Sequence, residues 1–119
     1  MYPQRLLDHF QNPRNVGELA PPAVTIETSN PACGDILRLA ARFEHGFAAE
    51  VRYKVRGCTA SIAAGSALTE WLTGKSRAEI ATFTPGIVDA AVGGLPAESK
   101  HAAALCADAV KALLSATKP

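Results

Sequence analysis

Two adjacent segments with a two-residue alternation constrain the fold of this chain more than any other feature of its sequence. Apolar side chains occupy every second position of both segments: Leu37, Leu39, Ala41 and Phe43 in the first, and Phe47, Ala49, Val51, Tyr53 and Val55 in the second. This period predicts two β-strands. Residues 44–46, Glu-His-Gly, suit a three-residue turn that ends in a glycine. We therefore expect an antiparallel hairpin in which Leu39 faces Val51 and Leu37 faces Tyr53, because apolar cross-strand partners share a face.

The predicted register also brings two cysteines together. Continued beyond the strands, it places Cys33 opposite Gly57, one residue from Cys58. A turn of another odd length also leaves the two thiols within one residue of each other. We therefore expect both thiols at the same end of the hairpin.

The remaining segments predict one further strand and several helices. The predicted elements are a short N-terminal helix that ends at Asn12-Pro13, a strand over 24–28, a helix over 59–73 that ends at Gly74, a short helix from the capping box Ser76–Glu79, and a last helix from about Glu98. Residues 84–86 and 93–96 are interpreted as breaks. Strands followed by helices predict one α+β domain over residues 1–119, with the helices packed on one face of the sheet.

The last predicted helix has a clear apolar stripe that should face the core. The stripe consists of Ala102, Leu105, Cys106, Ala109, Val110 and Leu113. Because successive helical residues turn by about 100°, His101 and Cys106 point roughly 140° apart and should not bind the same ion. We therefore interpret Cys106 as a core residue.

The bulk composition excludes several classes of protein. With 119 residues, 48% of them hydrophobic and 19% charged, the chain can build one small core and is not disordered. A net charge of +1 gives no strong field for nucleic acid or an anionic membrane, and no apolar stretch suits a membrane span. Three cysteines do not suit a disulfide framework, and the first residues do not resemble a secretory leader. We therefore expect free thiols in a cytoplasmic protein.

Four side chains are candidate metal ligands: Cys33, Asp35, Cys58 and His101. Cys58 precedes a predicted helix, where free backbone N–H groups and the helix dipole favour a thiolate. Two thiolates, a carboxylate and an imidazole suit a tetrahedral zinc or iron ion. The alternatives are buried cysteines, an Asx turn at Asp35 and a solvated histidine in a first helical turn. Nothing in the spacing places His101 near the cysteines. His9 and His45 are predicted to be surface or turn residues.

Several motifs in order resemble the IscU/NifU N-terminal scaffold family over nearly the whole chain. They are residues 7–17 (LDHFQNPRNVG), 31–35 (PACGD), 57–58 (GC) followed by 61–63 (SIA), 69–76 (TEWLTGKS), 100–101 (KH) and 108–111 (DAVK). The resemblance implies a three-stranded antiparallel sheet with helices on one face. It also implies that Cys33, Asp35, Cys58 and His101 surround a zinc or iron ion or a transient [2Fe–2S] cluster. In the family, a cysteine desulfurase supplies the sulfur, apo-proteins receive the cluster, and the aspartate keeps the cluster labile.

The sequence departs from the family pattern at two places. The third family cysteine, next to the histidine, is Ala102 here. The segment that the family presents to an Hsp70-type chaperone, Leu-Pro-Pro-Val-Lys, reads Leu-Pro-Ala-Glu-Ser over residues 95–99. The first change weighs against efficient sulfur uptake, and the second weighs against recognition by the chaperone.

Three functional hypotheses follow. The first is a non-enzymatic iron–sulfur cluster scaffold or carrier. The second is a sulfur acceptor that stimulates a desulfurase, like the SufE relatives of this fold, with Cys33 or Cys58 taking persulfide. The third is a divergent zinc-stabilised domain that binds a partner. Retention of Asp35 and His101 favours a metal site over pure sulfur transfer.

Overall fold

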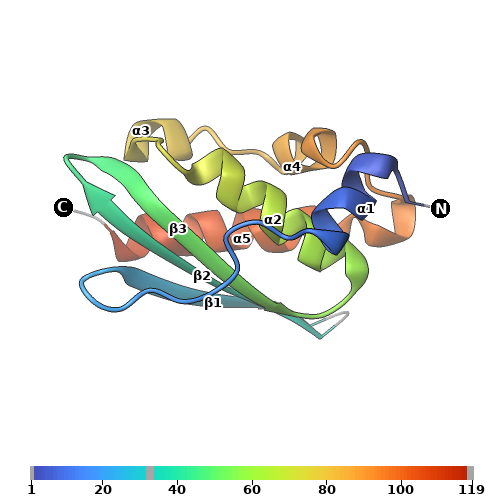
Figure 1. The fold of residues 1–119 in the computed structure, drawn as a ribbon, viewed down its shortest axis with the longest axis horizontal. Helices are drawn as coiled ribbons and strands as arrows, with labels where there is room; N and C mark the ends of the chain where they lie inside the picture. Colours follow the sequence, from blue (N-terminus) through green and yellow to red (C-terminus); the bar gives the residue numbers. More distant parts are fainter. Residues whose placement is uncertain (1, 32–33, 118–119) are drawn as a thin grey trace.

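The computed structural model describes residues 2–31 and 34–117 and shows a three-stranded sheet covered on one face by helices (Figure 1). The elements in chain order are α1 (Gln4–Gln11), β1 (Val24–Asn30), β2 (Asp35–Glu44), β3 (Phe47–Arg56), α2 (Thr59–Leu72), α3 (Arg77–Ile80), α4 (Pro85–Ala91), the 3₁₀ turn η1 (Ala97–Ser99) and α5 (His101–Ala116). The strands are antiparallel in the order β1-β2-β3. The predicted α+β class and the covered sheet face are confirmed.

The hairpin between β2 and β3 is confirmed, but its predicted register is wrong by two residues. Leu39 pairs with Tyr53, and Leu37 pairs with Val55. The turn is tighter than expected, because Glu44 pairs with Phe47 and leaves a loop of two residues, His45 and Gly46. Both have the positive φ that a two-residue hairpin turn requires. The two-residue turn shifts the pairing by one residue from the prediction, and a bulge at Ala49 shifts it by one more, which gives the difference of two.

The bulge also reverses which side chains of β3 face inward near the turn. Ala48 is fully buried, whereas Phe47 is 49% exposed. Beyond the bulge, Val51 and Tyr53 are buried as the alternation predicts. The turn end of the hairpin therefore presents an exposed aromatic ring that the sequence pattern assigned to the core.

Two long helices form the layer that packs on the sheet. Helix α2 contacts β3, while α5 contacts β1 and β2. The ring of Tyr53 reaches α2 where Gly65 leaves room: a Cβ atom there would lie 2.5 Å from Tyr53 Cε2. The predicted stripe of α5 is buried throughout, Cys106 included. Burial raises the pKa of the Cys106 thiol to about 12, as expected of an inert core cysteine.

Outside these two helices, one short helix matches the sequence reading and another does not. Ser76 and Glu79 form the predicted capping box at the start of α3. Residues 84–86 are not a simple break, because Pro85 is the first residue of helix α4. Proline is favoured at this position, where its missing N–H has no helical partner to lose.

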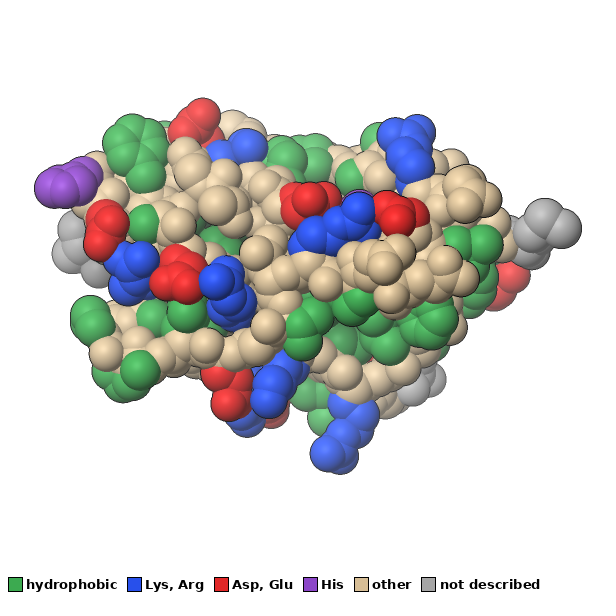
Figure 2. All heavy atoms as spheres, viewed as in Figure 1, with side chains coloured by type: hydrophobic (Ala, Val, Ile, Leu, Met, Phe, Trp, Pro, Cys, Tyr) green, Lys and Arg blue, Asp and Glu red, His purple; other side chains and the backbone are tan. Residues whose placement is uncertain are grey.

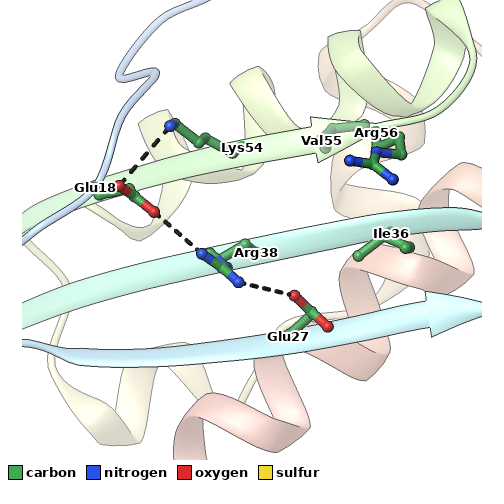
Figure 3. A pocket seen from close by; sticks show the side chains of 7 residues that line it. All are labelled: Glu18, Glu27, Ile36, Arg38, Lys54, Val55 and Arg56. Carbon is green, nitrogen blue, oxygen red and sulfur yellow. Dashed lines mark hydrogen bonds and ion pairs between the residues drawn. The ribbon is translucent and has the colours of Figure 1, made fainter.

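The outer face of the sheet carries charged side chains that mostly pair with each other. Arg38 and Lys54 both pair with Glu18, and Arg42 and Arg52 both pair with Glu50. Acidic and basic side chains also lie next to each other on the side of the molecule drawn in Figure 2. A hollow of about 430 Å³ on the outer face is lined by Glu18, Glu27, Ile36, Arg38, Lys54, Val55 and Arg56 (Figure 3). Within the described residues, no helix combines the length and the apolar character needed to cross a membrane.

Candidate metal centre

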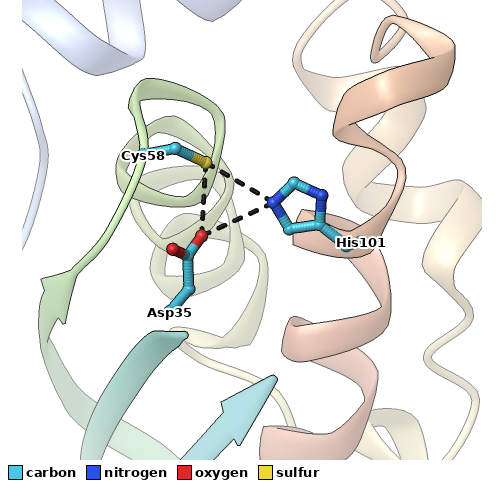
Figure 4. Close-up of side chains that lie close together, drawn as sticks. All are labelled: Asp35, Cys58 and His101. Atoms are coloured by element: carbon cyan, nitrogen blue, oxygen red, sulfur yellow. Dashed lines mark hydrogen bonds and ion pairs between the residues drawn. The ribbon is translucent and has the colours of Figure 1, made fainter. Parts of the chain in front are cut away.

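Three of the four predicted ligands lie together at one end of the sheet. Asp35 comes from the start of β2, Cys58 from the residue before α2, and His101 from the start of α5 (Figure 4). Cys58 Sγ lies 3.2 Å from Asp35 Oδ2 and 3.5 Å from His101 Nε2. Nε2 of His101 lies 3.5 Å from the same Oδ2 atom. These three residues are called the ligand group below.

Asp35 reaches this position because the hairpin brings it against Gly57. The two positions face each other when the β2–β3 register is continued by one residue. A Cβ atom at residue 57 would lie 2.5 Å from Asp35 Cγ, so a larger residue would push the carboxylate away. Asp35 is only 5% exposed. A buried carboxylate needs partners to remain charged, and the start of α2 supplies them.

Ser61, which the sequence reading did not identify as a functional residue, supplies one of these partners. It occupies the third position of α2, is 2% exposed, and donates a hydrogen bond of 2.5 Å to Asp35 Oδ2. Cys58 donates to the carboxylate through both its thiol and its backbone N–H. Burial alone would raise the pKa of Asp35, but the hydrogen bonds from Ser61 and Cys58 outweigh it, and the net pKa is lowered.

Helix geometry accounts for the positions of the other two ligands. Cys58 is the N-cap of α2, and its thiol lies 3.5 Å from Ser61 Oγ in the first helical turn as well as near Asp35. His101 is the first residue of α5, and its side chain is 25% exposed. Within the ligand group, His101 is therefore more exposed to solvent than Asp35.

The spacing of the three ligand atoms suits a tetrahedral metal ion. In a tetrahedral site with bonds of about 2.3 Å to sulfur and about 2.0–2.1 Å to nitrogen or oxygen, neighbouring ligand atoms lie roughly 3.3–3.6 Å apart. The observed separations are 3.2, 3.5 and 3.5 Å. Sulfur, nitrogen and oxygen donors together suit zinc or iron. The three residues therefore fit a metal with at least one coordination position left open.

The fourth predicted ligand, Cys33, lies outside the described residues, so its proximity to Cys58 remains a prediction. Ala102, where the family resemblance expected a cysteine, is fully buried in the core. Cys106 belongs to the core, as predicted, and not to the ligand group.

A second buried polar group ties the N-terminal segment to the middle of α2. Ser66 Oγ lies 2.7 Å from His9 Nδ1 and accepts the backbone N–H of Arg14 at 2.9 Å. We call His9, Arg14 and Ser66 the latch. His9 is 8% exposed, so its predicted surface position is wrong. Its burial follows from the packing of α1 on α2, which the local sequence does not reveal.

The whole chain also matches a known family. A family model for the NifU-like N terminal domain matches residues 1–118. The iron-sulfur cluster assembly scaffold protein IscU 1 of Archaeoglobus fulgidus is 36% identical over 111 residues, which cover 93% of this chain and 72% of that protein. The scaffold protein IscU of Azotobacter vinelandii is 36% identical over 115 residues, which cover 93% of this chain and 89% of that protein.

A solved structure supports the fold independently. The crystal structure of the N-terminal part of a nitrogen-fixing NifU-like protein from Brucella abortus aligns with a TM-score of 0.70 at 15% identity, covering 94% of this chain and 93% of that chain. The molecule is an α+β domain with a sheet covered on one face and a candidate metal site of sulfur, nitrogen and oxygen donors at one end of that sheet. The chain belongs to the family of NifU-like N-terminal domains.

Proposed function

We propose that this protein is an iron–sulfur cluster assembly scaffold or carrier without catalytic turnover of its own. It would hold a transient [2Fe–2S] cluster, or a zinc or iron ion, through Cys33, Asp35, Cys58 and His101. The observation that carries the proposal is the convergence of Asp35, Cys58 and His101 at separations of 3.2 to 3.5 Å. Cys33 is included among the proposed ligands because of its position in the motif at residues 31–35, which resembles that of the family. The cluster is cargo that the protein receives and passes on.

The ligand set suits cargo that must leave again. Thiolate and imidazole donors bind iron well, whereas a carboxylate is a harder and more weakly matched ligand for a cluster. Asp35 would therefore keep the cluster labile. The partners would be a cysteine desulfurase as the source of sulfur and apo-proteins as acceptors. Ala102 removes one sulfur receiver, and the segment at 95–99 weighs against an Hsp70-type chaperone as a further partner.

Anaerobic reconstitution with ferric iron and sulfide tests this function. We expect visible sulfide-to-iron absorption bands that disappear in Cys58→Ala and persist in Cys106→Ala, the control that removes a thiol from the core. The cluster should transfer to an apo-ferredoxin, and Asp35→Ala should slow its loss. If the unsubstituted protein forms no cluster and, when incubated metal-free with a cysteine desulfurase and cysteine, takes over the desulfurase's persulfide sulfur on Cys33 or Cys58, it is a sulfur acceptor. If it keeps zinc and forms neither, it is a zinc-stabilised binding domain.

A further inference from the structure

Ser61 is not one of the proposed ligands, yet it makes a hydrogen bond to one of them. Its hydroxyl is buried, and it donates to Oδ2 of Asp35, the same oxygen that faces Cys58 Sγ and His101 Nε2. A serine in the first turn of a helix commonly bonds with backbone groups nearby. This hydroxyl instead crosses from α2 to the first residue of β2. The contact thus joins two elements at the point where the metal would sit.

The Ser61 bond differs from the Cys58 thiol bond to Asp35 in what metal binding does to it. A cysteine ligand must lose its proton, so the hydrogen bond from the Cys58 thiol to Asp35 disappears when the metal binds. The Ser61 hydroxyl is not a ligand and keeps its proton. It therefore remains as the side-chain donor that fixes the carboxylate in the loaded site. A carboxylate oxygen has two lone pairs, so Oδ2 can accept from Ser61 and still bind a metal.

We propose, on the basis of the proposed metal-binding function, that Ser61 is a positioning residue that holds Oδ2 of Asp35 toward the metal and keeps Asp35 a ligand through one oxygen. Without the Ser61 hydroxyl only the backbone N–H of Cys58 still holds the carboxylate. The carboxylate can then turn, so that both of its oxygens or neither would bind the metal. Partners of this kind orient metal ligands and commonly change metal affinity by about 10–100-fold.

A double-mutant cycle with Co²⁺ as the probe tests the proposal. We expect Ser61→Ala to lower Co²⁺ affinity about 10-fold, at the lower end of that range. It should also change the intensity of the cobalt d–d bands, because these bands report the number and arrangement of ligands. In the Asp35→Ala background the same substitution should change affinity by less than about twofold, because Ser61 acts through Asp35.

Matched variants separate positioning from folding. Ser66→Ala removes a buried hydroxyl from the same helix away from the ligand group, and it should leave Co²⁺ affinity unchanged. Ser61→Thr and Ser61→Val have the same shape, but only the threonine keeps the hydroxyl. Cobalt affinity and band intensity should therefore be higher and closer to the unsubstituted protein in Ser61→Thr. This pair gives the comparison even if Ser61→Ala folds poorly.

Three outcomes would overturn the inference. They are an unchanged cobalt affinity and spectrum in Ser61→Ala, an equal loss of affinity in the Asp35→Ala background, and indistinguishable Ser61→Thr and Ser61→Val. Cobalt binding that shows the expected cycle, in a protein that assembles no cluster, would refute the scaffold function and leave the role of Ser61 intact. A protein that assembles a cluster but shows no cycle would do the reverse. If the unsubstituted protein binds no cobalt, the proposed role of Ser61 fails, and the cluster reconstitution alone decides the scaffold function.

Discussion

The ligand group and the latch both lie against α2 and both contain a histidine, but their polar atoms have different partners. Each places a histidine against α2, and each uses a buried serine of that helix: Ser61 for the first and Ser66 for the second. In the latch, Ser66 Oγ is engaged by His9 and by the backbone N–H of Arg14. In the ligand group, three atoms that bind metals face one point.

This difference distinguishes a group that stabilises the fold from a group whose atoms are placed to bind a cation. A buried hydrogen-bond network with matched donors and acceptors rigidifies the elements that it joins. A group of converging sulfur, nitrogen and oxygen donors gains most of its interactions only when a cation arrives. Substitutions in the latch should therefore change stability, and substitutions in the ligand group should change metal affinity.

The largest expected effect is that of His101→Ala on zinc affinity. Removing a direct ligand should lower the affinity more than about 100-fold, because even outer partners of a metal ligand are worth about 10–100-fold. His101 is partly exposed, so the free energy of unfolding of the metal-free protein should change by less than about 0.5 kcal/mol. Competition titration with a chromogenic chelator measures the affinity. Unchanged affinity would remove the imidazole from the site.

Ser66→Ala should give the opposite pattern. It leaves His9 Nδ1 and the N–H of Arg14 without their shared partner inside the protein. Loss of a buried partner costs about 1–3 kcal/mol, so the free energy of unfolding should fall by that amount. Urea unfolding of the metal-free protein, followed by circular dichroism, measures it. The zinc affinity of the variant should remain within about twofold of that of the unsubstituted protein, because Ser66 is distant from the proposed ligands. A large loss of zinc affinity would show that the latch and the ligand group are coupled.

Two glycines sharpen the comparison because each makes room for one side chain. Gly57→Ala introduces a Cβ 2.5 Å from Asp35 Cγ, so we expect about a 10-fold loss of zinc affinity as the carboxylate shifts. Gly65→Ala introduces a Cβ 2.5 Å from the ring of Tyr53. This overpacking should lower the free energy of unfolding by about 1–3 kcal/mol without changing zinc affinity. Equal effects of the two variants on both measurements would contradict the separation.

The smallest expected effect is a pH dependence that originates in the latch. Burial of His9, together with the nearby charge of Arg14, lowers its pKa from the ordinary value of 6.5. The unfolded chain therefore binds more protons than the folded protein at pH values below 6.5. Stability from this source is present above pH 6.5 and is lost as the pH falls through the lower pKa of the folded protein. Urea unfolding of the metal-free protein between pH 7.5 and 5 should show a steeper decline than in His9→Gln, and parallel curves would refute it.

The sequence predicted the elements of the hairpin well but not their register. Alternation requires the apolar faces of β2 and β3 to match. This requirement determines the register only to within two residues, because a shift of two residues keeps the same side chains on the same face. A three-residue turn and a two-residue turn with a bulge at Ala49 both satisfy it. The choice depends on the positive φ angles of His45 and Gly46, which the pattern of apolar residues does not encode.

The candidate site was predictable from the sequence only in part. Placing residues 33–35 and 57–58 at one end of the hairpin followed from strand geometry, whereas His101 was assigned through the family resemblance alone. Ser61 was missed because its contact depends on packing between the start of α2 and β2. For His9 a signal was present: it lies three residues after Leu6 on one helix face, and both are buried. The proximity of Cys33 remains a prediction.

Helix α5 is secured unequally at its two ends. Near its last turn the guanidinium of Arg77 donates to the carbonyl of Leu114 and to the hydroxyl of Thr117. At its first turn, which carries His101, no side chain among the described residues forms a capping hydrogen bond. A cluster held partly by that imidazole would sit at the end of the helix that lacks the anchor from Arg77, and its departure would require movement of only one side chain while the sheet stayed intact.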